Sequence, residues 1–332
     1  MAEKPLKLTP DNIARLAEQL FSDSVVKLSA PGGKSRESLR VHFETRTVVA
    51  TQRSKSGRMR MEVEVLKRLT AEGAPVPRYL VGGAGIFFQE DMGARRLSGE
   101  MLHTSGDAQI DVASRAVASL VEIRAAGKRA RLADIVPALG DKKEWVAGFV
   151  ASPTTVAQDF GFLSPELAMD KVVDRLNVVA DTFIKWDARP GNASIGKDTK
   201  VYWFDWEHCG KRHGVEDLAW LAGDEFWPVG AKDMAALFHR HLPVETRDEE
   251  IAYLGVYLTF HTVQRLRLIL RRHAKKGWID PLKAMKYDRI GVDRDLALRL
   301  CGHGRDWAER DALTRPMKAW FDACADKVET LA

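Results

Sequence analysis

The sequence predicts an α+β fold of two lobes, in which a small, mostly antiparallel β lobe precedes a larger helical lobe. Short β-branched segments are concentrated in residues 25–53, which is typical of strands joined by tight turns. Beyond Gly93, apolar residues recur mainly at helical spacing. The length of 332 residues suits two lobes that share a cleft. We therefore expect an N-terminal lobe at residues 1–93 and a C-terminal lobe at residues 94–332.

The first lobe should open with a helix, because Thr9 is a good N-cap and Pro10 suits the first helical position. A second helical period starts at Arg60 and stops before Gly73. Gly93 marks a hinge at the end of the lobe. Strand-like segments lie before and after the second helix, at residues 25–28, 39–43, 47–51 and 78–91.

The second lobe should consist mainly of helices, interrupted by a short strand at residues 201–206. Apolar residues fall at helical spacing over residues 108–125, 165–184, 216–222, 231–241, 248–272 and 306–330. A basic stretch on one of these helices suggests a solvated face, and its alternative is a surface for an anionic substrate or partner. It comprises Arg265, Arg267, Arg271, Arg272, Lys275 and Lys276.

Composition and charge argue against several classes of protein. The net charge of +5 weakly favours an anionic ligand such as a nucleotide, but it is too small to indicate nucleic-acid binding, and no zinc-finger or RNP pattern accompanies it. The three cysteines are widely spaced, which fits neither a disulfide framework nor a zinc site and favours a reducing, cytoplasmic setting. No apolar run approaches the length of a membrane span, so we expect no membrane partner.

The candidate chemistry of the second lobe centres on a loop and the strand that follows it. Asp187 and Asn192 lie five residues apart on the expected loop, and Asp205 ends the expected strand. Such a set suits phosphoryl transfer: one carboxylate accepts or orients a hydroxyl proton, while an amide oxygen and a second carboxylate hold Mg²⁺ against nucleotide phosphates. Apolar residues flank Asp205, and a carboxylate in such surroundings needs a partner or a metal. Taken alone, Asp187 and Asn192 could instead cap a helix and stabilise a turn.

With further motifs, this segment resembles the aminoglycoside phosphotransferase and choline kinase-like family, which has a protein kinase-like fold. The spacing Asp187-x-x-Pro-x-Asn192 matches the catalytic loop of the family, and Asp205-Trp206-Glu207 resembles its metal-binding segment. Asp217 begins an Asp-Leu-Ala segment that resembles one in the family, where the aspartate is structural. The resemblance runs in order from about residue 25 to residue 225.

The same resemblance implies that ATP and Mg²⁺ bind between the lobes. Glu62 matches the helix glutamate that normally pairs with a strand lysine. Glu90 and Met92 lie in a segment that resembles the hinge, whose backbone holds the adenine in the family. A turn-rich connection resembles the loop that covers the nucleotide, and it contains Gly32, Gly33, Lys34 and Ser35.

Two departures from the family pattern bear on activity. Lys185 and Trp186 precede Asp187 where the family usually has His-Gly, so a cation is expected near the proposed base. Thr51 stands where the phosphate-holding lysine of the family is expected, and a missing lysine would remove part of the electrostatic stabilisation of the phosphates.

Three explanations for the missing lysine remain open. In the first, Arg53, or Gln52 through a shifted register, substitutes for it, and in the second, Lys34 reaches the phosphates from the glycine-containing loop. Alternatively, the protein binds nucleotide without efficient phosphate transfer. Arg189 bears on this choice, because it lies two residues after Asp187 and an arginine there can contact phosphate oxygens at two points.

We therefore predict an ATP- and Mg²⁺-dependent phosphotransferase that acts on a hydroxyl of a small molecule. Asp187 and Arg189 are the predicted catalytic residues, and Asn192 and Asp205 are the predicted metal ligands. The alternative is a catalytically weak homologue that acts as a nucleotide-binding regulatory module. The basic balance of the chain argues weakly against a polycationic aminoglycoside acceptor.

Overall fold

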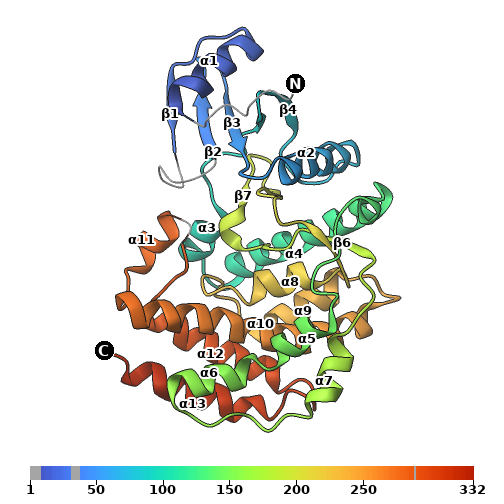
Figure 1. Ribbon diagram of the computed structural model, residues 1–332, viewed down its shortest axis with the longest axis vertical. Helices are drawn as coiled ribbons and strands as arrows, with labels where there is room; N and C mark the ends of the chain where they lie inside the picture. The colour runs from blue at the N-terminus through green and yellow to red at the C-terminus, as the bar shows by residue number, and fades with distance from the viewer. Residues whose placement is uncertain (1–8, 31–37, 288) are drawn as a thin grey trace.

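The computed structural model describes residues 9–30, 38–287 and 289–332. Within these ranges the chain has the predicted α+β fold, with a small β lobe next to a larger helical lobe (Figure 1). The β lobe contains a five-stranded antiparallel sheet in the order β1-β2-β3-β5-β4. Its strands are β1 (Lys27–Ser29), β2 (Ser38–His42), β3 (Thr47–Gln52), β4 (Tyr79–Gly83) and β5 (Ile86–Glu90).

Two helices of the β lobe pack on different sides of the sheet, because neighbouring residues of a strand point to opposite faces. Phe88 shares a small core with α1 (Pro10–Phe21), and Phe87 shares the large core of the molecule with α2 (Ser56–Ala71). Thr9 caps α1 as predicted. The large core thus continues from α2 into the helical lobe and joins the two lobes.

The helical lobe is arranged around α10 (Arg247–Lys276), which is buried without interruption from Tyr253 to Val263. It packs mainly against α8 (Glu216–Ala222) and α12 (Arg294–Ala308). The other helices are α3 (Leu97–His103), α4 (Gly106–Arg129), α5 (Lys143–Val150), α6 (Ser152–Phe160), α7 (Met169–Leu176), α9 (Ala231–His241), α11 (Pro281–Lys286) and α13 (Met317–Thr330). None of the helices in the described ranges is long and apolar enough to cross a membrane.

Two small antiparallel sheets position the candidate loops of the helical lobe. β6 (Thr182–Ile184) pairs with β9 (Gly210–Arg212), and β7 (Ala193–Ile195) pairs with β8 (Val201–Trp203). A single 3₁₀ turn, Pro190–Asn192, leads directly into β7. The hairpin of β7 and β8 lies between the sheet of the first lobe and the helices of the second (Figure 1).

Two of the predicted helices are wrong in extent. The helix expected over 165–184 ends at Leu176, and Phe183 belongs to β6 instead, because apolar residues of a short helix and a strand happen to fall at helical spacing. The helix expected over 306–330 is two elements, since α12 ends at Ala308 and α13 begins after Pro316. Proline cannot continue a helix but suits its start.

Candidate active site

Three segments that are far apart in the sequence meet between the two lobes: the residues after β3, the loop after β6 and the residues after β8. The Lys185 ammonium is 2.6 Å from the backbone oxygen of Asp205 and 3.4 Å from that of Asp187. The backbone N–H of Phe204 donates to the backbone oxygen of Asn192 at 3.0 Å. The loop of residues 187–192 therefore lies against the end of β8, as the predicted site requires.

The Asp187 carboxylate is held by two neighbours on its own loop. The Asn192 Nδ2 group donates to Asp187 Oδ2 at 2.9 Å and to the backbone oxygen of Asp187 at 3.0 Å. The Arg189 Nε atom lies 3.1 Å from Asp187 Oδ1. Since the Asn192 amide nitrogen faces Asp187, the amide oxygen is the part of this buried side chain that can face a cation.

The backbone of this region is strained. Trp186, Asp187 and Asp205 have positive φ values of 52°, 71° and 64°. Such left-handed conformations are costly for residues other than glycine and persist where surrounding contacts hold them. Asp217, at the start of α8, supplies such contacts by accepting the backbone N–H of Lys185 at 2.6 Å and that of Trp186 at 2.8 Å. Asp217 is thus a structural residue of the loop, as the resemblance implied.

Lys185 has a different role from the one expected of a cation near the proposed base. Its side chain is fully buried, and its ammonium donates to the backbone oxygens of Asp187 and Asp205 rather than to the Asp187 carboxylate. The ammonium also lies 5.4 Å from the centre of the Trp206 ring, a cation–π distance. Lys185 therefore links the loop after β6 to the end of β8 through hydrogen bonds to both backbones.

Arg53 makes the ion pair with Glu62 that the family resemblance assigns to a strand lysine. Thr51 is buried on β3, where its hydroxyl lies 3.1 Å from that of Ser38. Arg53 follows β3 and donates to both carboxylate oxygens of Glu62 on α2, at 2.6 Å and 2.8 Å. Glu62 is fully buried, so the paired arginine is required to neutralise it. This geometry fits the explanation in which Arg53 substitutes for the lysine, whereas Lys34 lies outside the described residues.

The pair of Arg53 and Glu62 also reaches the candidate metal ligand. Arg53 Nη2 donates to Asp205 Oδ1 at 2.7 Å, and Glu62 Oε1 accepts the backbone N–H of Trp206 at 3.1 Å. Burial raises the pKa of the Asp205 carboxyl, but the charges of Arg53, Lys185 and His208 outweigh it and hold the pKa below the usual value. Asp205 is therefore ionised at neutral pH and suited to a cation.

The remaining candidate nucleotide residues lie near the end of β5 or outside the described chain. Glu90 ends β5, where its carboxylate accepts the Arg78 Nε–H at 2.6 Å and its backbone N–H donates to the Arg78 backbone oxygen at 3.0 Å. Met92 is partly buried in the segment that joins the lobes. The predicted loop residues Gly32, Gly33, Lys34 and Ser35 lie outside the described residues.

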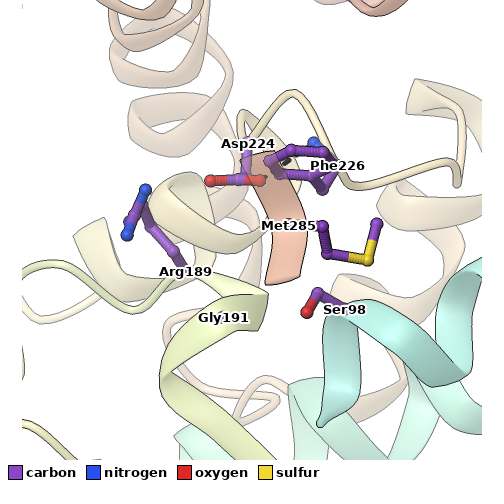
Figure 2. Close-up of a pocket in the computed structure, with 6 residues that line it drawn as sticks. All are labelled: Ser98, Arg189, Gly191, Asp224, Phe226 and Met285. Atoms are coloured by element: carbon purple, nitrogen blue, oxygen red, sulfur yellow. Dashed lines mark hydrogen bonds between the residues drawn. The ribbon is translucent and has the colours of Figure 1, made fainter. Parts of the chain in front are cut away.

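A small hollow lies beside the loop of residues 187–192 (Figure 2). Sequence reasoning missed all but one of its side chains, because no motif links α3, the segment between α8 and α9, and α11. Only the fold brings them to Arg189. The hollow is lined by Ser98, Arg189, Gly191, Asp224, Phe226 and Met285.

The basic stretch of α10 is not entirely a solvated face. Arg265 is buried, and its Nε and Nη2 groups donate to Glu225 Oε2 at 2.9 Å and 2.6 Å. The sequence interpretation is therefore wrong for this residue, because a buried acidic partner in a distant segment cannot be recognised from a local run of charge.

The pH dependence of stability should report the burial of Asp217. Burial raises the pKa of this carboxyl from 3.8 to about 6, although the N–H groups of Lys185 and Trp186 oppose the shift. A raised carboxyl pKa stabilises the fold below the unfolded pKa, and this contribution is lost as the pH rises through about 6. Relative to Asp217→Asn, the wild-type free energy of unfolding should fall by about 2 kcal/mol from pH 4.5 to pH 7.5.

Urea unfolding of both proteins at the two pH values checks this expectation. Groups other than Asp217 titrate in both proteins and cancel in the difference. A wild-type to variant difference that is the same at both pH values would contradict the assignment.

Comparison with known proteins identifies the fold. No protein-family model and no curated protein matches the sequence. Among solved structures, a choline/ethanolamine kinase family protein from Mesorhizobium loti matches with a TM-score of 0.57 at 13% identity, over 96% of this chain and 100% of that chain.

Two nucleotide complexes are also similar. An aminoglycoside 2'-phosphotransferase with GDP matches with a TM-score of 0.56 at 14% identity, over 83% of this chain and 97% of that chain. A spectinomycin phosphotransferase with ADP and spectinomycin matches with a TM-score of 0.54 at 10% identity, over 89% and 99% of the two chains. The predicted kinase-like fold is thus confirmed, in a strongly divergent sequence.

Proposed function

This chain has the fold of aminoglycoside phosphotransferases and choline/ethanolamine kinases. We infer that it is an ATP- and Mg²⁺-dependent phosphotransferase that acts on a hydroxyl of a small molecule. The observation that carries this proposal is the meeting of Asp187, Asn192 and Asp205 around the buried ammonium of Lys185. Asp187 and Asn192 come from the loop after β6, and Asp205 follows β8.

The donor set fits magnesium. Asp205 offers a carboxylate and Asn192 an amide oxygen, both hard ligands of the kind that Mg²⁺ prefers. In the part of the chain that the structure describes, no three His, Cys, Asp or Glu side chains gather as a metal cage. Mg²⁺ in nucleotide enzymes usually takes only one or two carboxylates and completes its shell with phosphates and water. When bound here, it would neutralise charge on the nucleotide phosphates.

The side chains have separate roles in this proposal. Asp187 orients the acceptor hydroxyl and takes its proton as the acceptor oxygen bonds to the terminal phosphorus and the bond from that phosphorus to ADP breaks. Asn192 and Arg189 hold the Asp187 carboxylate in one orientation. Arg53 brings a positive charge to the end of β3, and Glu62 and Asp205 hold it there. Lys185 and Asp217 are positioning residues.

A specific contact favours the regulatory alternative as the second candidate. Arg53 binds Asp205 Oδ1 at 2.7 Å, so the arginine competes with a cation for the same carboxylate. A protein in which Arg53 keeps this contact could bind nucleotide without efficient transfer. The two candidates differ in whether phosphate reaches an acceptor once Mg²⁺ and ATP are bound.

ATP with Mg²⁺ should raise the melting temperature, and the same ATP with EDTA should raise it much less. At about 100 times the Kd, ligand binding adds about 2.7 kcal/mol, which corresponds to about 4 °C for a chain of this size. Differential scanning fluorimetry measures the shift, and transfer of labelled terminal phosphate to a metabolite extract measures turnover.

Asp233 is exposed on α9, so Asp233→Asn should show the same ATP-dependent rise in melting temperature as the wild type. Absence of any stabilisation by ATP and Mg²⁺ would end the proposal. A Mg²⁺-dependent shift without transfer to any acceptor would select the regulatory candidate.

A further inference from the structure

Arg96 connects the segment between the lobes to the loop that carries the predicted metal ligand Asn192. It lies just after the predicted hinge Gly93 and directly before α3. Its backbone forms an antiparallel bridge with Ser194 on β7. Its Nη1 group donates a hydrogen bond to the backbone oxygen of Gly191. The side chain of a linker residue is therefore bonded to the peptide group that directly precedes Asn192.

The same guanidinium group contacts the segment that carries the other predicted metal ligand. It lies 5.0 Å from the centre of the Phe204 ring, a cation–π distance. Phe204 immediately precedes Asp205, and its backbone N–H donates to the backbone oxygen of Asn192 at 3.0 Å. Arg96 thus contacts both chain segments at the point where they meet.

The backbone at both ligands needs support from outside its own segment. Asp205 has a positive φ of 64°, a conformation that persists where surrounding contacts hold it. Asn192 ends a single 3₁₀ turn, in which its N–H donates to the backbone oxygen of Arg189 at 2.8 Å. Gly191 in this turn has no side chain to pack against its neighbours, so a hydrogen bond to its carbonyl group is a direct way to restrict it.

The preceding arginine shows that contact with the loop is not a general feature of the linker. Arg95 is exposed, and its Nε group donates to the Glu100 carboxylate on α3 at 2.9 Å. Its backbone oxygen accepts the N–H of Ile195 at 2.9 Å, so the linker backbone itself runs beside β7. Two neighbouring arginines therefore have different roles: Arg95 makes an ion pair at the surface, and Arg96 reaches the loop.

We propose that Arg96 is a positioning residue that holds Asn192 and Asp205 ready for Mg²⁺. Its charge-assisted hydrogen bond fixes the Gly191 carbonyl, and its contact with the Phe204 ring fixes the residue before Asp205. Ligands that are ordered before binding lose less conformational entropy when the ion arrives, which strengthens binding. The proposal rests on the proposed phosphotransferase function, because that function assigns Mg²⁺ to these two side chains.

A Mg²⁺ titration at a fixed, saturating concentration of ATP tests this role. The Mg²⁺ midpoint is the Mg²⁺ concentration that gives half of the ATP-dependent rise in melting temperature, measured by differential scanning fluorimetry. Arg96→Met should raise this midpoint about fivefold or more, because methionine keeps much of the length of the side chain but has neither the charge nor the donor. Arg96→Lys keeps the charge and a donor, so its midpoint should lie between those of the wild type and Arg96→Met.

The neighbouring residues provide a control and a second route to the same contact. Arg95→Met removes an arginine from the same linker while Arg96 keeps its contacts, and it should leave the midpoint within about twofold of the wild type. Phe204→Leu removes the ring and should raise the midpoint about threefold. In the Phe204→Leu background, Arg96→Met should have a smaller effect than in the wild type, because the two residues share one interaction. If Arg96→Met does not fold, Arg96→Lys and Phe204→Leu carry the test.

Hydrogen exchange, followed by NMR without nucleotide or metal, measures the positioning itself. The N–H groups of Asn192 and Phe204 donate to the backbone oxygens of Arg189 and Asn192. Both should exchange about fivefold faster or more in Arg96→Met than in the wild type or in Arg95→Met, because the loop opens more often when its anchor is lost.

The outcomes separate this role from a purely structural one. A folded Arg96→Met protein with the wild-type Mg²⁺ midpoint would overturn the proposal, even with a lower melting temperature, since a structural role predicts a loss of stability alone. Unchanged exchange at Asn192 and Phe204 would overturn it as well. If ATP and Mg²⁺ do not stabilise the wild type, the proposed function fails instead, and the exchange rates still decide whether Arg96 holds the loop.

Discussion

Replacing Asp205 with alanine should reduce kcat for phosphate transfer by at least about 10³-fold, equivalent to about 4 kcal/mol of transition-state stabilisation. The variant lacks the only carboxylate in the proposed magnesium site. The backbone oxygen of Asp205 remains, so Lys185 can still bind it, and Arg53 keeps its two hydrogen bonds to Glu62. The local structure should therefore persist while the chemistry is lost. Transfer of labelled phosphate, measured over a Mg²⁺ titration, checks this result.

The hairpin of β7 and β8 offers a matched control. Asp198 is exposed in its turn, where it accepts from the Tyr202 hydroxyl at 3.0 Å, and Asp198→Ala should retain wild-type kcat. Asp187→Ala and Asn192→Ala should each lower kcat by orders of magnitude through the same site. Undiminished turnover in Asp205→Ala, Asp187→Ala and Asn192→Ala together would rule out the proposed mechanism.

Replacing Arg53 with methionine should impair both stability and activity. Glu62 is fully buried, and removal of its partner leaves an uncompensated charge, which costs about 3–5 kcal/mol. The proposed site also loses the positive charge at the end of β3. The double variant Arg53→Met/Glu62→Gln should recover much of the stability, because the unpaired charge is gone, but it should not recover kcat. Chemical unfolding and phosphate-transfer assays measure the two effects separately.

Arg53→Lys tests the same position with charge retained. An ammonium can still pair with Glu62, but it cannot match both carboxylate oxygens as the guanidinium does. We expect an activity between those of the wild type and Arg53→Met. The matched control is Arg60→Met, since Arg60 is an exposed arginine of α2. Wild-type kcat in Arg53→Met would exclude Arg53 from the role of the missing lysine.

Local signals in the sequence were sufficient for much of the fold. The capping residue Thr9 predicts the start of α1, and the apolar period predicts α8 and α9 to the residue. The failures have a common cause. Residues 165–184 mix a helix face with a strand, and a periodic pattern carries no information about which partner each apolar residue packs against.

The sequence by itself determined which residue types could carry the chemistry, because the spacing from Asp187 to Asn192 and the end of the strand at Asp205 are local features. The tertiary structure decided which charged side chains contact them. Only folding shows that Arg53 reaches Glu62 and Asp205, and that Lys185 binds backbone oxygens instead of the Asp187 carboxylate. It also decided that Asp224 and Arg189 line the same hollow. The physical reason is that hydrogen bonds and ion pairs act over a few ångströms in space, between groups that the chain order separates by tens of residues.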